Sequence, residues 1–169
     1  MKKTIVKEIN NAFLLEIDRH YDNRGYFQET FSVNKYMDIA WRPAQINLSF
    51  SNKNVVRGLH VAPFAKLCTC VKGKLFDVIA DVRENSSTFG NWFGVWLDSN
   101  SCRQVYVPAG CAHGFFSAED ETILLYQQDL PYTPSVEKEI HWQDPKLSIK
   151  WPEVDAYTLS EKDQKAPCL

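Results

Sequence analysis

The chain has 169 residues, of which 44% are hydrophobic and 24% are charged, and its formal net charge at pH 7 is -2. This length suits one well-filled core and is short for two, so we expect a single domain over residues 1–169. The small net charge excludes a general electrostatic affinity for nucleic acid or for an anionic membrane, so we expect neither as a partner.

The N-terminal lysines are not followed by a long apolar run, and no window of the sequence reaches the roughly 20 apolar residues of a membrane span. We therefore expect a soluble protein that is not exported. Its five cysteines include no CxxC pair. Cys68 and Cys70 lie in one predicted strand, where buried, reduced thiols are more common than a disulfide, and we expect all the cysteines to serve packing. Reduced thiols favour a cytoplasmic location.

The first half of the chain is a series of short predicted strands separated by polar turns. The strands cover residues 5–9, 12–17, 26–31, 44–50, 55–60 and 66–71, and the clearest turn is DNRG at residues 22–25. Residues 32–39 are predicted as one short helix, with Ser32 as its cap.

The second half continues this pattern. Further strands are predicted at residues 75–83, 91–97, 104–107, 111–116 and 121–127, with tight turns at residues 72–74 and 108–110. After Tyr132 the pattern becomes irregular, and residues 160–165 are predicted as a short helical tail. About ten strands, roughly 8 to 12 residues apart, indicate an all-β sandwich or jelly-roll barrel.

The stretch from Arg57 to Gly73 carries the clearest chemistry, because it places His60 and Lys66 on two adjacent apolar strands. Side chains alternate between faces in a strand, so Lys66 shares one face with Cys68 and Cys70. Lysine is almost never fully buried without a partner. A lysine and a histidine in one barrel interior indicate an anionic ligand or a developing negative charge. A lone histidine is as readily a hydrogen-bonded core residue.

A metal site is the alternative for these histidines, because many jelly-roll barrels hold a divalent ion by two histidines one residue apart, a carboxylate and a further histidine. Here Ala62 stands at the second histidine position, and no glutamate follows in that strand. The segment PAGCAH, residues 108–113, matches the second half of the pattern. His60 and His113 are nevertheless short of the three protein ligands that an open catalytic site needs. We expect no metal and no other cofactor.

Three further residues have both a functional and an ordinary interpretation. Arg24 and Arg57 each precede a glycine, where an arginine is either a phosphate clamp beside a cleft or a solvated turn residue. Tyr126 lies in the middle of a predicted strand, where a tyrosine is more often part of the core than a catalyst.

Several blocks of sequence follow one another in a specific order along nearly the whole chain. The main ones are DNRGYFQETF (22–31), VVRGLH (55–60), KLCTCVKGKLFDVIADVRENSSTFGNW (66–92), VYVPAGCAHGFF (105–116) and LSEKD (159–163). In this order they resemble the dTDP-4-dehydrorhamnose 3,5-epimerase family. The resemblance implies a single cupin-like epimerase domain, a jelly roll or double-stranded β-helix without a metal. It also implies a homodimer in which N-terminal strands cross to the partner subunit.

The same resemblance implies a role for particular residues. His60 would be the general base, steadied by Asp163, and Tyr126 the proton donor on the opposite face of the sugar, with Lys66 as the cation near the C4 oxygen. Residues that would line the nucleotide-sugar site, some of them reaching in from the partner subunit, are Arg24, Phe27, Glu29, Gln45, Asn47, Arg57, His113, Tyr132 and Glu137. This set suits a 4-keto sugar, whose inversion needs a base, an acid and a positive charge for the enolate oxygen.

We therefore expect an isomerase that inverts C3, C5 or both in a nucleotide-linked 4-keto-6-deoxy sugar, of the type that converts dTDP-4-dehydro-6-deoxy-D-glucose to dTDP-4-dehydro-L-rhamnose. The alternatives are a 3- or 5-monoepimerase or keto-isomerase on another nucleotide sugar, and a non-catalytic cupin that binds a sugar nucleotide. The presence of both a base and an acid argues against the last. The segment of residues 61–65 is shorter than the usual loop of the family and the chain ends soon after Asp163, so the nucleotide and the sugar stay open.

Overall fold

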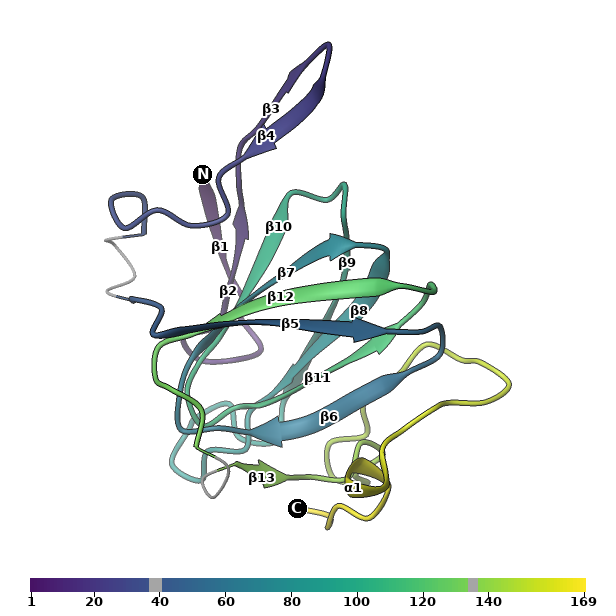
Figure 1. Cartoon of the computed structure of the whole chain (residues 1–169). Coiled ribbons are helices and arrows are strands. Elements are labelled where there is room, and N and C mark those ends of the chain that lie inside the picture. Colours follow the sequence, from purple (N-terminus) through teal and green to yellow (C-terminus); the bar gives the residue numbers. More distant parts are fainter. Residues whose placement is uncertain (37–40, 134–136) are drawn as a thin grey trace.

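The computed structural model describes residues 1–36, 41–133 and 137–169, and within them the chain forms antiparallel β-strands and one short helix (Figure 1). The all-β prediction is thus confirmed. Eight strands form the walls of a barrel: β5 (Gln45–Ser51), β6 (Val56–Val61), β7 (Lys66–Lys72), β8 (Lys74–Ala80), β9 (Trp92–Asp98), β10 (Arg103–Val107), β11 (Ala112–Ser117) and β12 (Thr122–Gln128).

The strand order is that of a jelly roll. One sheet has the order β1-β2-β10-β7-β12-β5, and the other has the order β13-β6-β11-β8-β9. The additional strands are β1 (Lys2–Ile5), β2 (Phe13–Glu16) and β13 (Lys138–Glu139). From β5 to β8 the chain alternates between the two sheets, so strands that are neighbours in sequence face each other across the interior instead of pairing.

Alternation along β7 and β8 divides their side chains between the barrel interior and its outer faces. Cys68 and Cys70 pack in the interior together with Leu75 and Ile79 of β8. Leu67 points the other way, into a separate cluster outside the six-stranded sheet. The predicted division of these strands into two faces is confirmed, and it explains how Lys66 comes to point inward.

The C-terminal segment covers the outer face of the five-stranded sheet. Trp142 and Trp151 pack there against Val56 and Val78, and the Trp151 indole donates a hydrogen bond to the Trp142 carbonyl at 2.8 Å. This packing positions helix α1 (Glu161–Gln164) beside β6, and the Ser160 side chain caps its N-terminus by accepting a hydrogen bond from the Asp163 N–H. The predicted helical tail is confirmed. Among the described residues there is no helix that is long and apolar enough to cross a membrane.

A hairpin of β3 (Arg19–Asp22) and β4 (Gly25–Gln28) projects away from the barrel (Figure 1). Phe27 on this hairpin is 69% exposed. The outer strand β5 also has an apolar exposed face, on which Leu48 is 67% exposed. The chain alone therefore leaves two apolar surfaces uncovered.

Three local predictions are wrong. Residues 6–9 form no strand, because Val6 and Ile9 are core residues carried by a turn that follows β1. Residues 33–36 form a turn in which two backbone N–H groups share the Ser32 carbonyl, and the rest of the helix predicted for residues 32–39 lies outside the described residues. All five cysteines are free, but Cys168 is exposed, so it serves no packing role.

Candidate active site

A pocket of about 380 Å³ opens between the two sheets of the barrel. Of the residues predicted for the site, those that line this pocket are His60, Lys66, Tyr126, Gln45, Asn47, Arg57, His113, Tyr132 and Glu137. Asp163 lies directly behind His60. The structure therefore brings together ten residues that are up to 118 positions apart in the sequence, counting from Gln45 to Asp163.

The wall from the six-stranded sheet owes its arrangement to strand register. Tyr126 on β12 is opposite Cys68 on β7 and opposite Asn47 on β5. In the adjacent row, Gln128 is opposite both Lys66 and Gln45. Residues directly opposite one another across antiparallel strands point to the same face. The register alone thus puts the lysine and the tyrosine on one wall of the pocket.

The opposite wall carries a histidine–carboxylate pair. The two atoms His60 Nε2 and Asp163 Oδ1 are 2.8 Å apart, and Asp163 Oδ2 accepts the Gly58 N–H at 3.3 Å. Burial alone would raise the pKa of Asp163, but the hydrogen bonds from His60, Gly58 and Ser160 outweigh it and lower the pKa. An ionised Asp163 keeps the proton of neutral His60 on Nε2, which leaves the Nδ1 lone pair free to act as a base.

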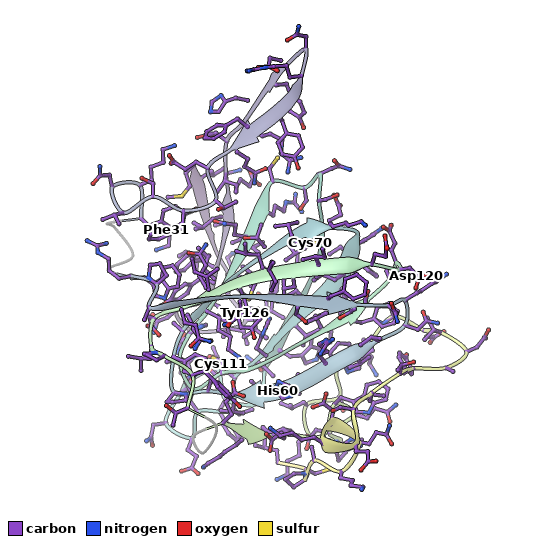
Figure 2. All side chains as sticks on the ribbon, viewed as in Figure 1. Phe31, His60, Cys70, Cys111, Asp120 and Tyr126 are labelled. Carbon is purple, nitrogen blue, oxygen red and sulfur yellow. The ribbon has the colours of Figure 1, made fainter. Side chains whose placement is uncertain are left out.

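Lys66 and Tyr126 lie in a poorly solvated part of the pocket. Burial lowers the pKa of Lys66, and the nearby Glu137 carboxylate, 3.8 Å from the ammonium, opposes that shift. Burial also raises the pKa of Tyr126, so its phenol is protonated at neutral pH and is available as a proton donor. Figure 2 shows Tyr126 on β12 and His60 on β6, which belong to different sheets. The base and the acid therefore approach a bound molecule from different walls.

Three groups in or beside the pocket were not predicted. Asp77 on β8 accepts a hydrogen bond from His113 Nε2 at 3.0 Å, and Cys68 Sγ lies 3.8 Å from the same nitrogen. Lys162 lines the pocket mouth and forms an ion pair with Glu139. The sequence carried a signal for Asp77, a charged residue on an interior-facing strand position, and for Lys162, which precedes Asp163.

Three predicted substrate-binding residues are absent from this pocket among the residues that the structure describes. Arg24 pairs with Asp22 at 2.5 Å at the tip of the hairpin, Phe27 is exposed, and Glu29 pairs with Lys35 at 2.8 Å. All three lie on the projecting hairpin or directly after it. The prediction that they contribute to a site in the partner subunit stays a prediction.

The fold and the pocket together define a class of protein. A cupin-type jelly roll that places a histidine–carboxylate pair on one wall and a lysine and a tyrosine on the other has the groups for proton transfer at a carbon next to a carbonyl. Comparison with known proteins specifies this class further.

The family model described as dTDP-4-dehydrorhamnose 3,5-epimerase matches residues 6–169. The chain is 38% identical over 167 residues to the dTDP-4-dehydrorhamnose 3,5-epimerase of Methanothermobacter thermautotrophicus, covering 95% of this chain and 90% of that protein. It is 40% identical over 168 residues to a dTDP-4-dehydrorhamnose 3-epimerase of Streptomyces niveus, covering 95% and 81%.

A solved structure agrees with these sequences. The crystal structure of the dTDP-6-deoxy-D-glucose-3,5-epimerase of Legionella pneumophila Philadelphia 1, in complex with dTDP-4-keto-L-rhamnose, matches with a TM-score of 0.94 and 35% identity, covering 99% of this chain and 92% of that one. This chain belongs to the dTDP-4-dehydrorhamnose 3,5-epimerase family.

Proposed function

We propose that the protein is an isomerase that inverts C3 and C5 of a dTDP-linked 4-keto-6-deoxy sugar, converting dTDP-4-dehydro-6-deoxy-D-glucose to dTDP-4-dehydro-L-rhamnose. The observation that carries this proposal is the His60–Asp163 pair on one pocket wall with Tyr126 on the other. Substrate and product are isomers, so the reaction needs no net oxidant or reductant.

The first step is removal of a proton from a carbon next to the C4 ketone. His60 Nδ1 takes this proton, and the ionised Asp163 stabilises the imidazolium that forms. The electron pair of the broken C–H bond moves toward the C4 oxygen, which becomes an enolate oxygen. Lys66 supplies a positive charge for this oxygen inside a pocket where water screens it weakly.

The second step returns a proton to the same carbon from the other side. Tyr126 donates its phenolic proton, so the configuration is inverted. His60 then passes its proton to solvent and Tyr126 regains one from solvent, and the same two steps at the second carbon next to the ketone complete the double inversion. A base and an acid on opposite walls suit inversion, whereas one group serving both functions would restore the original configuration.

The polar mouth of the pocket suits the diphosphate of the nucleotide. Arg57 is held by hydrogen bonds to Ser51 Oγ at 3.0 Å and to the Phe50 carbonyl at 2.7 Å, and its other guanidinium N–H donors have no hydrogen-bond partner among the described residues. Lys162 lies at the same mouth. Such donors fix a phosphate by charge-assisted hydrogen bonds.

Inversion of C3 alone is the second candidate, because the similar protein of Streptomyces niveus is a 3-epimerase. Incubation of the protein with dTDP-4-dehydro-6-deoxy-D-glucose in deuterated water decides between the two. We expect deuterium at both C3 and C5 and the L-rhamno product by proton NMR. Deuterium at C3 alone would establish the single inversion, and no deuterium at either carbon would contradict an epimerase.

We also propose that residues 1–169 act as one domain in the cytoplasm and that the active form is a homodimer. The free, buried thiols suit a reducing compartment. The projecting hairpin and the apolar outer face of β5 are the kind of surfaces that a second copy would cover. Arg24 and Phe27 on this hairpin would then serve the partner's pocket.

Mixed dimers test this shared site. We expect the Arg24→Ala homodimer and the His60→Ala homodimer each to be inactive. A mixed dimer that has one subunit of each variant, purified through two different tags, has one site with both substitutions and one site with neither. Its activity should be about half that of the wild type. Mixed dimers of His60→Ala and Tyr126→Phe are the control, since both residues belong to one barrel and neither site is intact. Equal inactivity of both mixed dimers would contradict the shared site.

A further inference from the structure

Three potential metal ligands meet at the floor of the pocket, in a group that we call the Cys68 cluster. It consists of Cys68 on β7, Asp77 on β8 and His113 on β11. The ligand atoms all lie within 4.8 Å of one another, with Cys68 Sγ and His113 Nε2 3.8 Å apart and His113 Nε2 and Asp77 Oδ2 3.0 Å apart. Cys68 and Asp77 are 0% and 1% exposed, and His113 is 7% exposed where it lines the pocket.

These distances suit a tetrahedral zinc ion. Zinc binds thiolate at about 2.3 Å and imidazole or carboxylate at about 2.0–2.2 Å, so ligand atoms on adjacent tetrahedral corners are roughly 3.3–3.6 Å apart. Two of the separations, 3.0 and 3.8 Å, bracket this range, the separation between Cys68 and Asp77 is within 4.8 Å, and side-chain rotations would bring the three ligands to the ion. Magnesium and calcium prefer oxygen ligands, so the thiol selects a thiophilic cation.

We propose that the Cys68 cluster binds one Zn²⁺ through Cys68 Sγ, His113 Nε2 and an oxygen of Asp77, with the fourth position open to the pocket, and that the ion reversibly inhibits the enzyme. Binding breaks the Cys68 S–H bond and releases that proton to solvent. It also moves the His113 proton from Nε2 to Nδ1, so that Nε2 donates its lone pair to the metal. No oxidation or reduction occurs.

Inhibition follows from the position of the cluster and rests on the proposed function. Cys68 is directly opposite Tyr126 in the strand register and two residues from Lys66 on the same face. A divalent cation there repels the Lys66 ammonium, which weakens the stabilisation that this charge gives to the enolate oxygen. The bound ion also engages His113, a pocket-lining residue that is then not available to the substrate.

The test is a metal titration with a spectroscopic readout that does not depend on catalysis. Metal-free protein is titrated with Cd²⁺ and Co²⁺, whose thiolate complexes absorb light, and then with Zn²⁺ in competition. A Cys168→Ser background removes the exposed thiol. We expect one ion per chain with thiolate absorbance, and binding about 100-fold weaker in Cys68→Val and Cys68→Ser. Cys70→Val is the matched control, because Cys70 is a buried thiol on the same face of β7, and it should bind like the parent.

Activity completes the test. Zn²⁺ should lower the exchange of deuterium into the sugar in the parent and in Cys70→Val, and EDTA should restore it, whereas each Cys68 variant should be insensitive relative to its own zinc-free rate. Failure to bind one ion, or equal binding by the Cys68 variants, would overturn the metal site. An active, zinc-binding enzyme that zinc does not inhibit would overturn the inhibition. Zinc binding by a protein that never exchanges deuterium would count against the proposed epimerase and not against the site.

Discussion

His60→Ala should lose both inversion of the sugar and exchange of its protons with solvent, whereas Tyr126→Phe should lose only inversion. Without His60 no enolate forms. Tyr126→Phe keeps the base and Lys66, so the enolate still forms, and His60 returns a proton to the original face. The His60 side chain is 31% exposed, so it exchanges its proton with solvent. In Tyr126→Phe we expect inversion to fall by about 10²–10⁴-fold, as for a lost general acid.

Proton NMR of the sugar nucleotide recovered from deuterated buffer measures both processes. Deuterium should enter the substrate of Tyr126→Phe with its configuration retained. Tyr106→Phe is the matched control, because Tyr106 is a half-buried strand tyrosine that stacks on Phe13 outside the pocket. Inversion at the wild-type rate by Tyr126→Phe, or exchange at that rate by His60→Ala, would show that the acid and the base are wrongly assigned.

Asp163→Asn should reduce the exchange rate by about 10²–10⁴-fold with a small change in KM. An asparagine that satisfies the Gly58 N–H with its oxygen turns its amide N–H toward His60 Nε2. Nε2 then becomes the acceptor, and the proton of neutral His60 moves to Nδ1, which is no longer a base. A role limited to stability would change the melting temperature without this loss of kcat.

The pKa of Asp163 gives the same variant a second readout. Its folded pKa is lower than the unfolded value of about 3.9. The ionised carboxylate therefore stabilises the fold above that value, and the stabilisation is lost as the pH falls through the folded pKa. The melting temperatures of wild type and Asp163→Asn should differ at pH 7 and converge below about pH 4.

Asp144→Asn is the control for this pair of measurements. Asp144 is also buried, and its carboxylate accepts backbone N–H bonds from Lys146, Leu147 and Leu169. It is not one of the residues that line the pocket. Its replacement should lower the melting temperature and leave kcat unchanged. A similar loss of kcat in both variants would show that Asp163 acts only through stability.

The features that the sequence predicted well are those that depend on local alternation. The inward direction of Lys66, Cys68 and Cys70 follows from a period of two along one strand, and strand register then carries it across the sheet. The link between His60 and Asp163 spans 103 positions and has no local pattern, so it came only from the resemblance to a family.

Other features depended on packing between distant segments. The Cys68 cluster needs three strands from both sheets, and a pattern along one strand gives no information about it. Residues 6–9 begin and end with the β-branched residues Val6 and Ile9, which favour a strand locally, but these two side chains fill the core from a turn. For these residues, burial of the side chains in the core outweighs the local preference for a strand.

The strand order also determines how the protein acquires activity during folding. In the six-stranded sheet, β1 and β2 are the only paired strands adjacent in sequence among the described residues, and β7 pairs with β12 and β10 across long stretches of chain. Closing such long loops before any contact is gained makes folding slow, on the scale of about milliseconds to seconds for barrels of this kind. Lys66 and Tyr126 become neighbours only when β7 and β12 pair, so a partly folded chain with local hairpins alone has no working site. Recovery of catalysis during refolding therefore reports the closing of the barrel as a whole.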